Sequence, residues 1–168
     1  MIPENLIETK ELVFDKCGFD LRNLEIEKES AEYSACKFDL DIIKILFRVA
    51  KITPTKIGQF VTFWKRSENG PIEPYAVSDS IDFFIINTKS NDKFGQFIFP
   101  KSVLSQQGII STDLKEGKRG IRVYPPWDLT ESKQAQKTQK WQLEYFLEIP
   151  LNKSVNLDRA KQLYTIID

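Results

Sequence analysis

The chain has 168 residues and a mass of 19.5 kDa, and its 24 basic and 24 acidic side chains leave no net charge. This length suits one domain with a substantial core and leaves little room for a second. Because the sequence contains no histidine, Ser-His-Asp hydrolases, Cys-His proteases and His-ligated zinc or iron sites are excluded, and any catalysis would depend on carboxylates, lysine, tyrosine or a carboxylate-bound Mg²⁺ or Mn²⁺.

The N-terminal part of the chain predicts a helix followed by strands. Residues 5–14 place apolar side chains at helical spacing, and Gly18 is expected to end this helix. Residues 42–49 alternate like a strand with one face in the core, which would put Lys44 and Arg48 together on the other face. After a turn at residues 52–59, residues 59–66 are rich in Phe, Val, Thr and Trp and predict a second strand.

The middle of the chain predicts a hairpin, and its end predicts two helices. Residues 81–87 and 95–99 read almost continuously apolar on either side of a polar link, so we expect central strands that the terminal helices cover on both faces. A short strand follows at 121–124. Asp128 with Glu131 would cap a helix running to 147, and a final helix is expected over 157–166. These elements predict an α+β fold: a single domain whose mixed or antiparallel central sheet is flanked by N- and C-terminal helices.

The cysteines, the first residues and the lengths of the apolar runs indicate where in the cell the protein is located. The two cysteines, Cys17 and Cys36, follow no disulfide or metal-binding pattern, which fits a reducing compartment. The first residues lack the features of a signal peptide, and no apolar run is long enough to span a membrane. We therefore expect a cytoplasmic protein that has no membrane partner. The sequence does not indicate an oligomeric state.

Positive charge is concentrated in the centre of the chain. Residues 1–43 hold 5 basic and 11 acidic side chains, residues 44–140 hold 16 and 9, and the remainder hold 3 and 4. Such a division often marks an anionic partner. The predicted binding residues for nucleic acid or another anion are Arg48, Lys51, Lys56, Lys65, Arg66, Lys101, Lys118, Arg119, Arg122 and Trp127.

Several motifs accompany these basic residues. They are residues 47–61, the Trp64-Lys65-Arg66 triplet, and residues 95–101, 117–119, 122–127 and 139–142. Together they make residues 33–147 resemble the MepB-like family, bacterial cytosolic proteins named after a multidrug-efflux operon. The resemblance implies a restriction-endonuclease-like fold, but it implies no particular reaction.

A nuclease of that fold class would need an acidic residue on one strand and an acid-or-Gln, any residue, Lys triplet on the next, so that carboxylates hold Mg²⁺ and the lysine positions water. Asp82 and Gln96 match this pattern in part. The triplet is broken because Gln96 is followed by Phe97 and Ile98, and Lys101 lies five residues on. Asp82, Gln96 and Lys101 are the candidate catalytic residues, with Asp82 as the metal ligand, and Mg²⁺ is expected only under this hypothesis.

Four functions therefore remain open. Non-enzymatic nucleic-acid binding explains both the charge division and the aromatic residues, because lysine and arginine neutralise phosphates and aromatic faces stack on bases. The alternatives are a metal-dependent nuclease with a degenerate site, a pocket for a small anionic or drug-like ligand, and a protein-interaction patch near residues 125–127. We predict nucleic-acid binding, with no cofactor.

Overall fold

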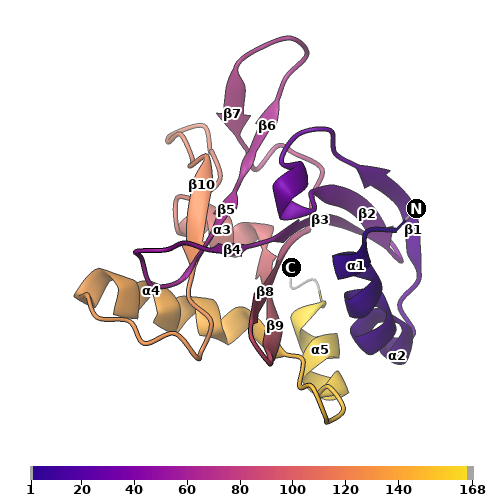
Figure 1. The fold of residues 1–168 in the computed structure, drawn as a ribbon. Helices are drawn as coiled ribbons and strands as arrows, with labels where there is room; N and C mark the ends of the chain where they lie inside the picture. The colour runs from indigo at the N-terminus through magenta and orange to yellow at the C-terminus, as the bar shows by residue number, and fades with distance from the viewer. Residues whose placement is uncertain (1, 166–168) are drawn as a thin grey trace.

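The fold is built on a six-stranded mixed sheet, sheet A, in a computed structural model that describes residues 2–165. Its strands, in spatial order, are β1 (Leu21–Ile26), β2 (Cys36–Leu40), β3 (Ile43–Val49), β8 (Phe83–Ser90), β9 (Lys93–Pro100) and β11 (Phe146–Glu148). Strands β3 and β8 pair in parallel, and all other neighbours in the sheet are antiparallel (Figure 1). The predicted α+β fold with a mixed sheet is confirmed.

Strands β8 and β9 form the predicted hairpin at the centre of sheet A. They pair from Phe83 opposite Pro100 to Ser90 opposite Lys93. Asn91 in the connecting turn has φ 57°, a left-handed conformation that asparagine tolerates better than most residues. The hairpin is therefore specified by local sequence, and it holds the strands in a fixed register.

The terminal helices cover one face of sheet A (Figure 1). The N-terminal segment runs through α1 (Glu4–Thr9), a π-helical turn η1 (Lys10–Phe14) and α2 (Asp15–Cys17), and it ends at Gly18, whose φ is 76°. Helix α5 (Leu157–Leu163) begins where the Asn156 side chain accepts the Arg159 backbone N–H. Ile166, to which this helix was expected to extend, lies outside the described residues.

The opposite face of sheet A is covered by a second, three-stranded sheet, sheet B. It contains β4 (Lys51–Ile52), β5 (Gln59–Thr62) and β10 (Gly120–Val123), in the order β10-β5-β4. Its inner face packs Val61, Ile121 and Val123 against the core, together with helix α3 (Lys101–Gln106). The expectation that terminal helices cover both faces was therefore wrong, because a second β layer occupies one of them.

Two further elements border sheet B. Strands β6 (Trp64–Arg66) and β7 (Ile72–Pro74) form a hairpin that projects from the body (Figure 1), so the predicted strand 59–66 is split at Phe63. Helix α4 (Lys133–Gln142) is capped by Ser132, which accepts the Ala135 N–H at 3.1 Å, and the predicted cap at Asp128 was wrong. The short helices η2 (Ala31–Tyr33) and η3 (Leu143–Tyr145) complete the fold. Among residues 2–165, none of the helices has the length and apolar character to cross a membrane.

Candidate functional site

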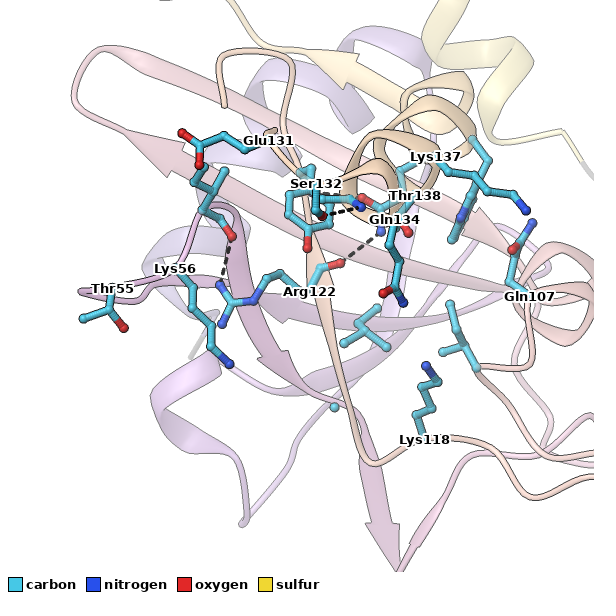
Figure 2. A pocket seen from close by; sticks show the side chains of 18 residues that line it. Thr55, Lys56, Gln107, Lys118, Arg122, Glu131, Ser132, Gln134, Lys137 and Thr138 are labelled. Carbon is cyan, nitrogen blue, oxygen red and sulfur yellow. Dashed lines mark hydrogen bonds between the residues drawn. The ribbon is translucent and has the colours of Figure 1, made fainter. Parts of the chain in front are cut away.

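A cavity of about 830 Å³ opens between the end of sheet B and helix α4. Four basic side chains and one acidic side chain line it, and we call it the basic groove. Lys56 comes from the loop before β5, Lys118 from the loop before β10, Arg122 from β10 and Lys137 from α4, while Glu131 precedes α4. Figure 2 shows these side chains arranged around one opening.

Arg122 is the most firmly positioned cation of the basic groove. Its Nη1 donates to the Thr53 hydroxyl at 3.0 Å and to the carbonyl oxygens of Ile57 and Gly58, each at 3.3 Å. Its guanidinium also lies over the Phe60 ring, 6.0 Å from the centroid. Within residues 2–165 no acidic side chain pairs with it, so its positive charge is held in place and remains available.

The loop that carries Lys56 is held against β10 by a close approach between Gly58 and Tyr124. Gly58 has φ 86°, in the left-handed region that favours glycine, and a Cβ atom there would lie 2.7 Å from the Tyr124 ring. Only glycine therefore allows this packing without rearrangement. The contact fixes the loop beside Arg122.

Helix α4 is attached to β10 by two glutamine side chains. Gln142, almost fully buried, accepts the Tyr124 N–H at 2.8 Å and donates to the Arg122 carbonyl at 3.0 Å. Gln139 donates to the carbonyl oxygens of Pro125 and Asp128, both at 2.9 Å. These bonds satisfy backbone groups of a strand edge and a loop that would otherwise lack partners. They hold α4, which forms one side of the basic groove, against β10 and the loop that follows it.

The three lysines of the basic groove have no counter-charge within residues 2–165. Lys56, Lys118 and Lys137 are exposed, and none of them has an ion-pair partner in the described part of the chain. Uncharged polar side chains from Gln107, Gln134 and Thr138 lie among them, as Figure 2 shows. The lining is therefore cationic and hydrogen-bonding, which suits an anionic ligand.

Arg48 lies in the core rather than on the predicted basic surface. Its side chain is only 1% exposed, and its Nη2 lies 2.6 Å from Glu27 Oε2 and 2.9 Å from the Tyr75 hydroxyl. The prediction that Arg48 and Lys44 share a solvent-facing side was wrong for Arg48. The reason is that both faces of β3 are covered, so alternation along the strand does not separate core from solvent.

Most of the other predicted cations are engaged within the chain. Lys65 pairs with Asp79 at 2.6 Å, Arg66 with Glu29 at 3.0 Å and Arg119 with Glu116 at 3.0 Å. Lys101 donates to the backbone carbonyls of Val77 and Asp79, and Lys51 lies over the Tyr33 ring at 5.1 Å. Of the ten predicted binding residues, the basic groove brings together Lys56, Lys118 and Arg122.

Trp127 is half-buried and packs its ring edge-on against Phe146, 5.9 Å away. Its indole nitrogen is buried and has no hydrogen-bond partner among residues 2–165. Trp127 therefore contributes to the hydrophobic cluster beneath sheet B. The aromatic rings that border the basic groove are those of Tyr124 and Trp141.

The three candidate catalytic residues do not converge on one site. Lys101 lies opposite Asp82, whose carbonyl accepts its backbone N–H at 3.1 Å, but Gln96 pairs with Asn87, five positions further along β8. That separation corresponds to about 17 Å at 3.3 Å per residue. Gln96 is fully buried, donates to Asn87 at 3.0 Å and accepts the Tyr164 hydroxyl at 2.5 Å.

Asp82 also lacks the surroundings of a metal ligand. Its carboxylate accepts the Lys44 backbone N–H at 2.8 Å, and no group of three His, Cys, Asp or Glu side chains that could hold a metal ion occurs in residues 2–165. Asp79 is occupied by Lys65 and by the Ala76 N–H. The residues therefore do not fit the Mg²⁺ that the nuclease hypothesis requires.

Sequence reasoning missed Lys137, which completes the basic groove. The signal was present: Gln134, Lys137, Thr138 and Trp141 recur at i, i+3, i+4 and i+7 and form one face of α4. A polar helical face with one aromatic residue is more often solvent-exposed surface, so the pattern became informative only once β10 was placed beside it.

Comparison with known proteins agrees with the motifs in the sequence. A crystal structure of MepB is similar to this chain, with a TM-score of 0.76 and 35% sequence identity, over 90% of this chain and 99% of the other. A search among curated proteins finds no match. The MepB-like family model matches residues 27–148, a range that includes Gly58, β10 and α4. The chain belongs to the MepB-like family.

Proposed function

We propose that this chain binds nucleic acid through the basic groove. The observation that carries the proposal is the convergence of Lys56, Lys118, Arg122 and Lys137 on one cavity that contains a single acidic side chain, Glu131. These cations come from separate parts of the chain, and the fold places them together without neutralising them by ion pairs.

The chemistry of the lining supports a phosphate ligand. Lysine and arginine that lack internal partners can replace the counterions of a phosphate backbone, and this exchange drives salt-dependent binding. Arg122 is restrained by its bonds to Thr53 and the 57–58 carbonyls, so little side-chain entropy is lost when it meets a phosphate. Tyr124 and Trp141 supply ring faces that bases could contact.

The proposal is tested by the salt dependence of binding. Fluorescence anisotropy of labelled 12-nucleotide DNA and RNA oligonucleotides should give dissociation constants that rise steeply with salt. Three or four phosphate contacts correspond to a slope of roughly −2 to −4 when the logarithm of the association constant is plotted against the logarithm of the salt concentration. Lys118→Gln and Lys137→Gln should each weaken binding and reduce the magnitude of that slope by about one.

Lys16→Gln is the matched control for these variants. Lys16 is exposed on α2, on the opposite side of the molecule from α4 (Figure 1), so its removal changes net charge equally without touching the basic groove. If Lys16→Gln and Lys137→Gln weaken binding to the same extent, attraction depends on net charge and the groove is not the binding site.

A small anionic ligand is a second candidate, and the size of the cavity favours it. A volume of about 830 Å³ lies within the range of small-molecule sites. Length dependence separates the two: a mononucleotide or inorganic phosphate that binds as tightly as a 12-nucleotide strand would identify a small-ligand site. Affinity that grows with strand length would identify a polymer site.

The nuclease hypothesis has no comparable support, because Gln96 lies five positions along the β8–β9 hairpin from the neighbouring Asp82 and Lys101. The restriction-endonuclease-like fold implied by the family resemblance stays a prediction. Incubation of purified protein and oligonucleotide with Mg²⁺ or Mn²⁺ tests cleavage directly. Cleavage that Asp82→Ala abolishes would revive the hypothesis.

A further inference from the structure

The outer face of sheet B, which points away from the core, continues the basic groove onto a second surface. Lys51, Phe60 and Arg122 are direct cross-strand partners, so their side chains share this face. Arg122 lies over the Phe60 ring, and Phe60 meets the Tyr33 ring edge-on at 6.4 Å. Lys51 in turn lies over Tyr33. Sheet B therefore presents two cations, Arg122 and Lys51, on either side of the Phe60 ring, and Tyr33 from a neighbouring loop packs among them.

Residues 27–34 form a loop that covers part of this surface, and we call this loop the acidic strap. Its base is closed by the Glu27 N–H, which donates to the Ala35 carbonyl at 3.0 Å. Between these ends the chain leaves sheet A and passes through η2. The acidic strap contains three glutamates and one lysine. An acidic segment thus lies over a face that carries two cations and the Phe60 ring.

The acidic strap is held at its base more firmly than along its length. Glu27 pairs with the buried guanidinium of Arg48. Beyond it, Glu29 pairs with Arg66 where both side chains are more than 40% exposed, and the buried Ser30 accepts the Thr62 hydroxyl at 2.9 Å. The half-buried Tyr33 ring packs against Phe60 and Lys51. Glu32 lies on the surface. An exposed ion pair contributes little to stability, so a phosphate could replace the Glu29 carboxylate at little cost.

The backbone of the acidic strap is also strained. Ser30 and Ser34 have φ values of 58° and 50°, a left-handed conformation that is unfavourable for residues other than glycine, asparagine and aspartate. Release of the segment would relieve this strain. The contacts that oppose release are those to Arg66, Thr62, Phe60 and Lys51, together with a hydrogen bond from Asn5 to Ser34.

We propose that the outer face of sheet B is a second contact surface for nucleic acid and that the acidic strap competes with it there. The Glu29 carboxylate takes the place of a phosphate on Arg66, in strand β6 next to sheet B, and Tyr33 takes the place of a base against Phe60. Bound nucleic acid displaces residues 28–34 while Glu27 remains on Arg48. This inference rests on the proposed binding in the basic groove, because the groove leads onto this face through Arg122.

The test compares two double variants of the full chain in the anisotropy assay. Glu29→Gln/Glu32→Gln removes two negative charges from the acidic strap, and Glu11→Gln/Asp15→Asn removes two from exposed positions on the N-terminal helical segment. We expect the strap variant to tighten 12-nucleotide binding by about fivefold at moderate salt. The control should change it by less than about twofold, because screening weakens distant charges.

Amide hydrogen exchange supplies a readout that does not depend on affinity. Addition of the oligonucleotide to the wild-type chain should speed exchange in residues 28–34 and slow it around Lys118 and Lys137. Equal gains in affinity for the two double variants, or an acidic strap that becomes more protected in the complex, would overturn the proposal.

A failure of the proposed function would look different. If neither the wild-type chain nor any variant binds the oligonucleotide at low salt, the proposed binding in the basic groove is ruled out. If the wild-type chain binds and Lys137→Gln weakens binding while the strap variant behaves like its control, the basic groove stands and the acidic strap is only structural.

Discussion

The carboxylate of Glu27 lies 2.6 Å from the guanidinium of Arg48, which is 1% exposed. The Tyr75 hydroxyl shares this guanidinium at 2.9 Å, and burial is the main cause that raises the pKa of Tyr75 well above its ordinary value. The Arg48 Nε has no partner among residues 2–165, so the ion pair with Glu27 is the principal compensation for a buried charge.

Glu27→Gln should therefore destabilise the protein strongly. The substitution leaves the Arg48 guanidinium buried without a counter-charge, a change that costs about 3 kcal/mol. Glu29→Gln, which removes an exposed pair, is the control and should cost less than about 1 kcal/mol. Urea denaturation of the three proteins measures both effects, and equal losses for the two variants would contradict the assigned burial of Arg48.

Gln142→Leu should weaken the attachment of α4 to β10 and lower the stability of the protein. Leucine fills a similar volume but leaves the Tyr124 N–H and the Arg122 carbonyl without partners, at a cost of about 2 kcal/mol. Gln136→Leu on the same helix is the control, since Gln136 is exposed and makes only a 3.3 Å bond to the Thr130 carbonyl.

The two glutamine variants also differ in their expected effect on binding. Because Gln142 sets the position of β10 against α4, Gln142→Leu should weaken oligonucleotide binding more than Gln136→Leu does. Thermal denaturation and anisotropy measure the two effects separately. An affinity that is unchanged in a destabilised Gln142→Leu protein would show that the attachment of α4 to β10 does not control binding.

The parts of the fold that sequence predicted are those with local causes. The β8–β9 hairpin follows from two apolar runs and a turn with Asn91 in the left-handed region, and α5 follows from the cap at Asn156. The N-terminal helical segment likewise ends at Gly18, as predicted. In each case the residues that determine the element lie within or next to it.

The parts that were missed depend on contacts between distant segments. Whether Arg48 meets solvent depends on what covers β3, and the covering sheet B is assembled from strands on either side of the β8–β9 hairpin in sequence. The basic groove likewise joins Lys56 to Lys137 only because Gly58 packs on Tyr124 and Gln142 holds β10. Spacing along the chain carries no information about such neighbours. The motifs at 122–127 and 139–142 marked the region without showing its geometry.

Gly58→Ala should disturb the basic groove more than it disturbs the fold. Its Cβ would lie 2.7 Å from the Tyr124 ring, and the residue would also have to keep a φ of 86°. Gly18→Ala is the control, because Gly18 has φ 76° but no atom lies within 4 Å of its added Cβ. Both variants carry the left-handed backbone penalty of about 1 kcal/mol, and only Gly58→Ala adds a steric clash.

The difference between the two glycine variants therefore isolates the clash. We expect a larger loss of thermal stability for Gly58→Ala, together with weaker oligonucleotide binding, since the carbonyl of Gly58 holds Arg122. Gly18→Ala should bind normally. Equal stability losses would mean that the Tyr124 ring moves aside without consequence.

Asp128, in the loop before α4, makes the free energy of unfolding depend on pH. Burial raises the pKa of its carboxyl above the ordinary value of 3.8, with Lys93 opposing the shift. A raised pKa means that the folded state holds the proton more tightly than the unfolded state. Ionisation of Asp128 therefore lowers the free energy of unfolding as the pH rises through 3.8 and past the folded-state pKa. The decrease is complete at neutral pH.

Asp128→Asn removes this titration, because the amide stays neutral and has a similar shape. The variant should be more stable than the wild-type protein at pH 7, and its advantage should disappear by about pH 3, where the wild-type carboxyl is protonated in both states. Urea denaturation of both proteins at the two pH values provides the measurement. A variant that is less stable at pH 7 would show instead that the ionised carboxylate makes a favourable interaction that outweighs its partial burial.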